Sequence, residues 1–274
     1  MDTVLSSTRI KGAERAAVVS TITPYRARVI PVPADLWRGH TVLRVIYRAA
    51  ECAAAGVALL LASPIIALEA ILIRLDSPGP ALFWQRRMGQ SVARRGQDLA
   101  HRDDLIPPEG GFKPDALYLV PETIYFVKFR TMHVDARERF PQLYEVSFPN
   151  HEAFMGSYYK SENDPRVTRV GQFLRRTTLD ELPNLWLVFT GKMRLVGPRP
   201  EGPWFLPYYS AEQMLKFAVA PGVTGLAQCN GRGQLRIGDQ IAYDLEYVRI
   251  RSVWVDLKIL IKTLLSVLKR KGAF

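Results

Sequence analysis

Hydrophobic and polar positions divide the chain into one long apolar segment and a mixed remainder. Residues 52–73 read CAAAGVALLLASPIIALEAILI. A helix of this length is about what the hydrocarbon core of a bilayer, roughly 30 Å thick, requires. Pro64 interrupts the run, and Ser63 directly before it can cap a new helix. The pattern therefore predicts a membrane helix over residues 42–75 that breaks at Ser63 and Pro64 into two halves.

Basic residues flank this segment on both sides. Arg38, Arg44 and Arg48 precede it, and Arg74, Arg86 and Arg87 follow it. Because basic residues favour the cytoplasmic side of a membrane, both ends are expected there, and the helix is predicted to be re-entrant. A kinked helix that spans the bilayer is the alternative, since transmembrane helices tolerate proline.

The rest of the chain mixes strand and helix patterns. ALFWQRR and TIYFVKFRTM have strand character and predict a small β-hairpin. The polar stretch 91–122 between them contains Pro-Pro and Gly-Gly pairs and is interpreted as a long loop inserted in the hairpin. Residues 1–41 show no sustained period and are interpreted as an extended or loosely ordered amino-terminal arm.

The carboxy-terminal segment from residue 253 onward is amphipathic and rich in lysine. Its apolar residues at helical spacing are Val253, Leu257, Leu260, Ile261, Leu264 and Leu268. Such a helix can lie in the membrane interface or pack against the core, and the pattern leaves both open. Together these elements predict an α+β fold, mostly helical, in a single membrane-associated domain with a cytoplasmic part over residues 76–274.

The composition of the chain indicates the class of its binding partners but says little about its fold. Lys and Arg total 37 against 26 Asp and Glu, a formal net charge of +11. This balance favours anionic partners such as nucleic acid, acidic lipids or phosphorylated substrates. Cys52 and Cys229 make neither a disulfide framework nor a metal-ligand set, and the four scattered histidines lack ligand spacing. The cysteine content fits a reducing compartment.

Two adjacent carboxylates stand out in this basic chain. Asp180 and Glu181 lie in TTLDELPN, after two arginines and before Pro183. One interpretation is structural, because Thr178 and Glu181 match a capping box. The other makes Asp180 the N-cap, which tolerates Pro183 in the first helical turn and keeps Asp180 ionised at the positive end of the helix dipole.

The second arrangement has a chemical use. A carboxylate at an anion-binding helix start can attack a phosphorus atom once the phosphate charge is neutralised. A second carboxylate beside it can help to hold a divalent cation that supplies this neutralisation. The pair by itself does not decide between capping and catalysis.

Five stretches occur in an order that resembles the bacterial sugar transferases, the monotopic phosphoglycosyl transferases. They are SPGPALFWQRRMG, FVKFRTM, DPRVTRVGQFLRRTTLDELPNLWLVFTGKMRLVGPRP, PGVTGLAQCNGRG and YVRIRSVWVDLKILIKTL. The resemblance implies transfer of a sugar 1-phosphate from a UDP-sugar to polyprenyl (undecaprenyl) phosphate with release of UMP. It places this first membrane step of surface polysaccharide or glycoconjugate synthesis at the cytoplasmic face of the bacterial plasma membrane. A re-entrant helix broken at a Ser-Pro pair is part of the resemblance.

The resemblance also implies roles for the carboxylates. Asp180 is the expected nucleophile and forms a covalent sugar-phosphate intermediate. Glu181 is expected to assist with proton handling and, together with Asp180, with a Mg²⁺ ion. Arg175 is expected to hold the polyprenyl phosphate.

Further substrate contacts are expected from a loop and a strand. Pro198, Arg199 and Pro200 are implied to contact the nucleotide, and the two prolines stiffen the loop around a bidentate phosphate donor. Lys128 and Arg130 of KFRTM are expected phosphate neighbours, although both also fit a basic strand edge that faces lipid headgroups.

Some features depart from the family pattern or leave the function open. The insertion 91–122 is longer than the family's loop, and Ala227 stands where tryptophan is common. The expected partners are a UDP-sugar, polyprenyl phosphate and membrane lipids, with a homodimer left open and nucleic acid not expected. A membrane-anchored basic protein that binds nucleic acid or acidic lipid without catalysis is the alternative. A second enzymatic alternative is direct transfer without a covalent intermediate.

Overall fold

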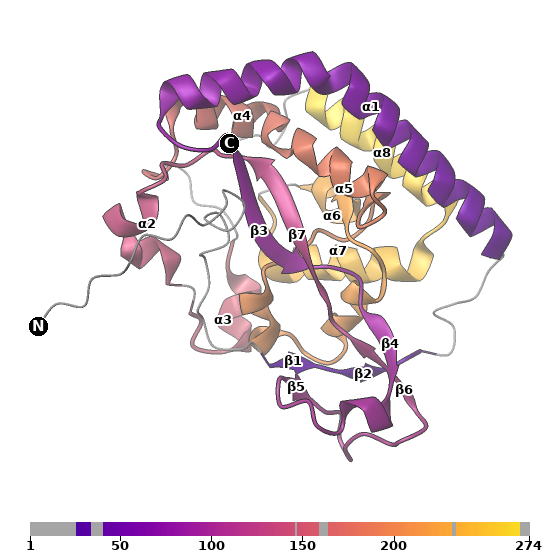
Figure 1. The fold of residues 1–274 in the computed structure, drawn as a ribbon. Coiled ribbons are helices and arrows are strands. Elements are labelled where there is room, and N and C mark those ends of the chain that lie inside the picture. The colour runs from indigo at the N-terminus through magenta and orange to yellow at the C-terminus, as the bar shows by residue number, and fades with distance from the viewer. Residues whose placement is uncertain (1–25, 34–40, 146, 159–163, 232–233, 269–274) are drawn as a thin grey trace, which may run out of the picture.

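The computed structural model describes residues 26–33, 41–145, 147–158, 164–231 and 234–268, and it confirms the predicted α+β class (Figure 1). The helices are α1 (Thr41–Asp76), α2 (Ala136–Arg139), α3 (His151–Gly156), α4 (Arg169–Thr177), α5 (Leu185–Phe189), α6 (Leu226–Asn230), α7 (Ile237–Ile250) and α8 (Val253–Leu268). The strands are β1 (Ala27–Arg28), β2 (Ile30–Pro31), β3 (Leu82–Met88), β4 (Val92–Arg95), β5 (Leu105–Ile106), β6 (Leu117–Val120), β7 (Thr123–Phe129), β8 (Arg194–Val196) and β9 (Gly222–Thr224). Short 3-10 helices are η1 (Gly96–Leu99), η2 (Pro141–Tyr144), η3 (Leu179–Asn184), η4 (Pro203–Tyr208) and η5 (Gln213–Ala218).

The apolar segment forms one uninterrupted helix, so the expected second helix start at Ser63 is wrong. Pro64 lies inside α1 and lacks the N–H that would donate to the carbonyl of Leu60. The hydroxyl of Ser63 donates to that same carbonyl oxygen at 2.7 Å. Ser63 thus replaces the missing donor instead of capping a new helix, which lets the helix continue through Pro64.

Much of the surface of α1 is apolar and exposed. Among the described residues, α1 is the helix that is long and apolar enough to cross a membrane, over Val45–Asp76, and only 11% of its apolar window is buried. Leu60, Leu61 and Leu75 are each more than 70% exposed, at 74%, 74% and 79%. A soluble surface rarely carries so large a continuous apolar area. The helix is therefore suited to a lipid environment.

The predicted hairpin is confirmed, with β3 and β7 antiparallel and paired from Leu82 with Phe129 to Met88 with Thr123. The insertion between them is more ordered than the predicted loop. Its strands β4 and β6 pair with each other, and β2 of the amino-terminal arm pairs with β6. Similarly, β1 pairs with β5.

Residues 26–33 therefore differ from the loosely ordered arm that was expected, whereas residues 1–25 and 34–40 lie outside the described part. Ala27, Val29 and Ile30 belong to the main hydrophobic core, together with Tyr118 and Leu119 of the insertion. The same core contains aromatic residues of the central domain, namely Phe154, Phe205, Tyr209 and Phe217. The arm and the insertion are thus packed on one shared core.

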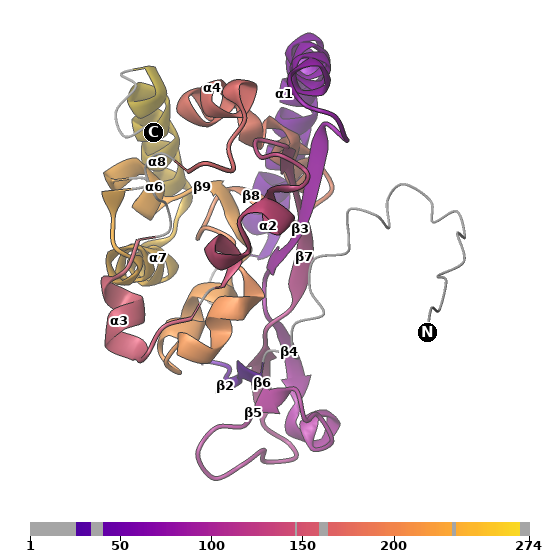
Figure 2. The ribbon, with the colours of Figure 1, turned by 90° about the vertical axis from the view of Figure 1, so that its left-hand side faces the viewer.

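Figure 2 shows α1, α4 and α8 at one end of the molecule and β4, β5 and β6 at the opposite end. The amphipathic helix α8 is confirmed. Its Ile259 is buried, while Trp254 and Leu264 are 73% and 61% exposed. The helix therefore packs on the core along one side and presents apolar side chains along another, at the same end of the molecule as α1.

Candidate active site

The two carboxylates lie in a tight reversal between α4 and α5. Thr178 takes a left-handed conformation at φ 64°, and the 3-10 helix η3 then begins at Leu179. Asp180 and Glu181 occupy the first turn of η3, so the prediction that Asp180 is the N-cap is wrong. No capping hydrogen bond comes from the Thr178 side chain either. Leu179, the residue before the two carboxylates, packs on a hydrophobic cluster with Phe129 and Leu174, which helps to fix the turn.

Thr131, directly after the hairpin, positions α4 and with it the carboxylates. Its carbonyl oxygen accepts the backbone N–H of Thr168 at 3.1 Å, and the Thr168 side chain caps α4. A Cβ at Gly171 would lie 2.2 Å from the carbonyl oxygen of Thr131, so only glycine permits this approach. The hydroxyl of Thr131 accepts a 2.9 Å hydrogen bond from Nε of Arg175. The hairpin end therefore fixes both the helix and its arginine.

The dyad is joined to the Pro-Arg-Pro loop by an ion pair. Nη2 of Arg199 donates to Oε1 of Glu181 at 2.7 Å. Glu181 raises the pKa of Arg199 above its ordinary value through this charge and hydrogen bond, against the effect of burial. Asp180 beside it is 9% exposed. The structure thus brings Asp180, Glu181 and Arg199 together.

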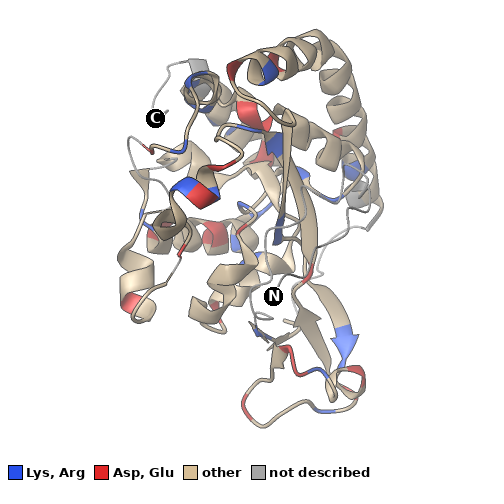
Figure 3. Ribbon diagram, turned by 60° about the vertical axis from the view of Figure 1, so that its left-hand side comes forward, with Lys and Arg blue, Asp and Glu red and all other residues tan. Residues whose placement is uncertain are grey.

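Lys128 and Arg175 complete a basic surround for the carboxylates. Burial lowers the pKa of Lys128 to about 8, although Asp180 opposes this shift, and the nearby Arg175 lowers the pKa further. Burial also lowers the pKa of Arg175, again with Asp180 opposing it. Figure 3 shows basic and acidic segments intermixed beneath α1. Both predicted cations therefore lie within electrostatic range of Asp180.

Arg130 is the exception among the predicted phosphate neighbours. Its guanidinium donates to the carbonyl oxygens of Pro78 at 2.8 Å, Ser77 at 2.7 Å and Ile73 at 3.4 Å. These carbonyls lie at the carboxy-terminal end of α1, where a helix has unpaired acceptors. Arg130 thus secures the end of α1 and is not part of the dyad cluster.

The Pro198–Pro200 loop leaves strand β8 and is held by its neighbour β9. The N–H of Gly197 donates to Thr224 at 2.9 Å, and the N–H of Gly222 donates to Pro198 at 2.9 Å. A Cβ at Gly222 would lie 2.0 Å from the nitrogen of Gly197. This close backbone approach, together with the prolines, gives Arg199 a fixed base from which to reach Glu181.

Sequence reasoning missed two charged residues near this site. Arg87 of β3 lies within electrostatic range of Lys128, and its guanidinium stacks over the rings of Phe126 and Trp204. In the hairpin, Phe83 is paired with Lys128. Side chains alternate between the two faces of a strand, so Arg87, four residues after Phe83, lies on the same face as Lys128. The alternation along this strand could have indicated that position for Arg87. Glu69 of α1, 4% exposed, also interacts with the charge of Asp180. No local pattern indicated that contact.

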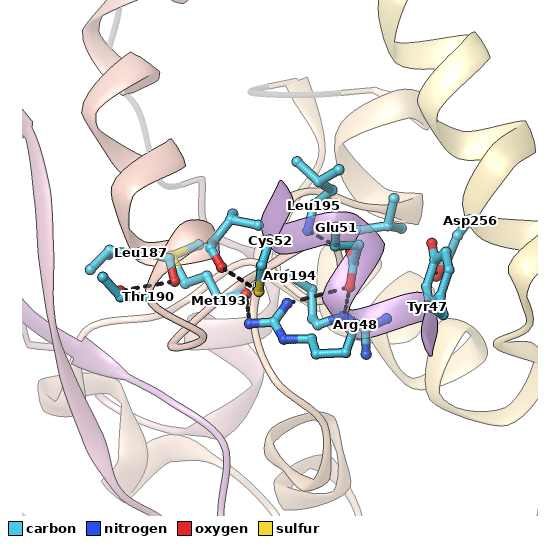
Figure 4. Close-up of polar contacts among 12 residues, drawn as sticks. Tyr47, Arg48, Glu51, Cys52, Leu187, Thr190, Met193, Arg194, Leu195 and Asp256 are labelled. Carbon is cyan, nitrogen blue, oxygen red and sulfur yellow. Dashed lines mark hydrogen bonds and ion pairs between the residues drawn. The ribbon is translucent and has the colours of Figure 1, made fainter. Parts of the chain in front are cut away.

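A second charged network ties the beginning of α1 to the same domain (Figure 4). Glu51 is 3% exposed and pairs with Arg194 of β8 and with Arg48. Its Oε1 accepts the N–H of Leu195 at 3.1 Å. Nearby, the hydroxyl of Tyr47 donates to Asp256 of α8 at 3.0 Å. These contacts anchor the beginning of α1 to the domain that carries the dyad.

The end of α1 is tied by a further contact, from Asp76. Its Oδ2 accepts the backbone N–H of Val170 in α4 at 3.1 Å. With Arg130 on the last carbonyls, this contact joins α1 to the helix that leads into the dyad. Both ends of α1 therefore contact one domain.

The donor set at the dyad suits a cation that shares its ligands with a substrate. Among the described residues, no group of three or more His, Cys, Asp or Glu side chains could hold a metal ion alone. Mg²⁺ commonly takes one or two protein carboxylates and completes its shell with water and phosphate oxygens. Asp180 can supply such an oxygen, whereas Oε1 of Glu181 is already engaged by Arg199. The residues fit a substrate-assisted site better than a closed metal cage.

Comparison with known proteins shows which proteins this chain resembles. The family model for bacterial sugar transferases matches residues 42–95 and 119–270. The chain is 42% identical over 148 residues to a UDP-galactose-lipid carrier transferase of Erwinia amylovora, which covers 54% of this chain and 31% of that protein. It is 34% identical over 241 residues to the UDP-glucose:undecaprenyl-phosphate glucose-1-phosphate transferase of Escherichia coli, covering 85% of this chain and 42% of that protein.

A relative of similar size is the exopolysaccharide production protein ExoY of Rhizobium meliloti, 32% identical over 227 residues, with 83% of this chain and 87% of that protein covered. By contrast, the chain spans less than half the length of the first two relatives. The family match omits residues 96–118, which lie in the predicted insertion. With most of the chain matched and the dyad region inside the match, this protein belongs to the bacterial sugar transferase family.

Proposed function

We propose that this protein transfers a sugar 1-phosphate from a UDP-sugar to undecaprenyl phosphate and releases UMP, as a first membrane step of exopolysaccharide or related glycan synthesis. The observation that carries the proposal is the 2.7 Å contact between Arg199 and Glu181. It brings a rigid arginine loop, suited to a diphosphate, against the carboxylate of Glu181, beside the buried Asp180 and in a basic surround. The names of the relatives supply the donor and acceptor classes.

In the first half of the proposed reaction, a carboxylate oxygen of Asp180 attacks the phosphorus that carries the sugar. A bond forms between this oxygen and phosphorus, and the phosphoanhydride bond to UMP breaks, so UMP leaves with the electron pair. Arg199 binds the diphosphate, and Lys128 and Arg175 offset the charge that develops on it. Asp180 and Glu181 would hold a Mg²⁺ ion, whose chemical contribution would be neutralising charge beside the phosphates.

In the second half, a phosphate oxygen of undecaprenyl phosphate attacks the same phosphorus. The acyl phosphate bond to Asp180 breaks, which regenerates the carboxylate and leaves a lipid diphosphate sugar. Arg175 is suited to the acceptor phosphate because α4, on which it lies, is joined to α1 through Asp76 and Val170. The acceptor would reach the dyad from the lipid side along this helix pair.

Release of UMP tests the function directly. Purified protein is incubated with a panel of UDP-sugars, with and without undecaprenyl phosphate, and UMP is measured. The proposal expects sustained UMP release only when one of the UDP-sugars and the acceptor are both present. A protein that binds lipid or nucleic acid without chemistry would release no UMP in any arm, and that result would refute the proposal.

The proposed membrane arrangement is re-entrant, with both ends of α1 at the cytoplasmic face. What supports it is that Glu51 near one end and Asp76 at the other are tied to the same domain. A helix that spanned the bilayer would place these two contacts on opposite sides of roughly 30 Å of hydrocarbon, where one domain could not make both. In the re-entrant arrangement, the exposed apolar residues between the two contacts lie in the cytoplasmic leaflet.

Cysteine labelling is expected to find both ends of α1 on one side. Cys52 and Cys229 are replaced by alanine, and a cysteine is placed at Val42, 70% exposed, or at the exposed Arg95. A membrane-impermeant maleimide should label both positions in inverted vesicles and neither in intact spheroplasts. Labelling of either site from the periplasm would contradict the re-entrant arrangement and favour a full span.

The transfer rate is expected to fall as the pH rises through about 8, because burial lowers the pKa of Lys128 to about 8. Below this pH the ammonium group is charged and offsets phosphate charge; above it the charge is lost. Lys128→Arg keeps its charge throughout and should abolish the fall, even if its rate is lower. Initial UMP release between about pH 6.5 and 9.5 measures this. A fall of the same size in the arginine variant would assign the titration to another group.

A further inference from the structure

A buried cluster of charges lies behind the Pro198–Pro200 loop. Lys216 of η5 is 1% exposed, and its Nζ lies 2.8 Å from Oδ2 of Asp244 and 3.2 Å from Oε1 of Glu201. The hydroxyl of Tyr209 is 3.5 Å away. Asp244 and Glu201 are 0% and 3% exposed. Such a cluster loses the hydration of each of its charges on folding, so its members must pair closely.

The neighbouring acidic groups keep Lys216 charged, whereas burial acts against the ionised form of Asp244. Burial acts to lower the pKa of Lys216, but Asp244, Tyr209 and Glu201 together raise it above its ordinary value. Burial raises the pKa of Asp244 to about 6, against the opposing effects of Lys216 and the backbone amide of Arg199. Lys216 therefore remains a cation between two carboxylates.

The loop that carries Arg199 is fixed at both ends, and Glu201 is the fixed point on the carboxy-terminal side. The carbonyl oxygen of Glu201 accepts the N–H of Met88 at 2.7 Å, which joins the loop to the end of β3. Its side chain reaches Lys216. Because Pro200 is rigid, the position of Glu201 limits the positions available to Arg199. A displaced Lys216 would release the loop on the side away from β9.

We infer that Lys216 is a positioning residue for donor binding: through its contact with Glu201 it fixes the Pro198–Pro200 loop so that the guanidinium of Arg199 faces Glu181 and the nucleotide diphosphate. This inference rests on the proposed function. Lys216 itself is enclosed by its partners and touches no substrate. It acts on the affinity for the nucleotide through Arg199, and the chemistry at Asp180 does not involve it.

A double-mutant cycle tests this role on the full chain in detergent. The variants are Lys216→Met, Arg199→Lys and the double substitution, and the measurements are the Kd for UDP by calorimetry and the KM and kcat for UDP-sugar. Lys216→Met should raise Kd and KM about tenfold, within the coupling range of one charged network, with a smaller change in kcat. In the Arg199→Lys background it should add little. If the factors by which the two single substitutions raise Kd simply multiply in the double variant, the inference is overturned.

Glu201→Gln is the second variant, for the case that Lys216→Met does not fold. It keeps the side-chain shape and the backbone bond to Met88 but removes one charge from Lys216, so a smaller rise in Kd with the same dependence on Arg199 is expected. Lys113→Met, at an exposed position of the insertion, is the control and should leave Kd unchanged. UDP binding without UMP release would refute the proposed function, while the cycle on Kd would still decide the role of Lys216. Absence of UDP binding to the unmodified protein would refute both.

Discussion

Asp180→Asn should abolish transfer and leave a folded, membrane-bound protein. The amide has the shape of the carboxylate but neither its charge nor most of its nucleophilicity, and removal of a catalytic nucleophile costs about a thousandfold or more in rate. Folding should survive because Asp180 lies within η3 and does not cap it. UMP release and thermal denaturation measure the two properties. The unmodified protein should show ping-pong kinetics and should stop on removal of divalent cations with a chelator.

Trapping of the intermediate makes this prediction specific to Asp180. With UDP-sugar labelled in the sugar and no acceptor, label should remain on the unmodified protein and be absent from Asp180→Asn. Asp135→Asn is the matched control, since Asp135 is 57% exposed and paired only loosely with Arg139 at 3.7 Å. That variant should retain label and turnover. Sequential kinetics with no trapped label would instead support direct transfer, and an active Asp180→Asn would exclude Asp180 as the nucleophile.

The other large effect is expected at the base of the membrane helix. Glu51→Ala should lower the free energy of unfolding by about 3 kcal/mol, because it leaves the two arginines and the N–H of Leu195 without their shared buried acceptor. In a chain of this size that corresponds to roughly 6 to 12 °C in Tm. Denaturation of the detergent-solubilised protein, followed by tryptophan fluorescence, measures the change.

An exposed ion pair provides the comparison for Glu51. Glu212 and Arg249 are 3.0 Å apart and each 67% exposed. Glu212→Ala removes the same kind of side chain from solvent-accessible surroundings, where an ion pair contributes about 0 to 1 kcal/mol. Its effect should be well below that of Glu51→Ala. Equal losses in the two variants would mean that the network around Glu51 does not anchor α1.

The features that the sequence predicted correctly are those that depend on short stretches of chain. The hairpin and the amphipathic terminal helix follow from side-chain period, and a long apolar helix follows from length and composition. The family resemblance assigned Glu181 and Arg199 to one active site, and the structure adds their 2.7 Å contact. These predictions needed no knowledge of how distant segments meet.

The errors arose where distant segments meet. Arg130 follows Lys128 closely, yet the carbonyls at the end of α1 take its guanidinium. The strands at Ala27–Arg28 and Ile30–Pro31 are too short to show a period, and partners in the insertion stabilise them. The helix α1 continues through Pro64, and the Ser63 hydroxyl bonds the carbonyl oxygen of Leu60 that the proline leaves without its usual donor. Lys216 was missed because no motif surrounds it, although its complete burial makes it one of the most constrained charges in the domain.

The pairing of the arm with the insertion sets a practical limit on how the protein can be produced. A recombinant chain trimmed to residue 42, where the family match begins, would retain every residue assigned here to donor and acceptor binding. It would nevertheless leave β6 as an edge strand, deprive β5 of its partner and uncover the core around Tyr118 and Leu119. Unpaired edges beside exposed apolar surface promote aggregation. Expression boundaries for this protein should therefore lie before residue 26, and deletion of the insertion should be attempted only together with the arm.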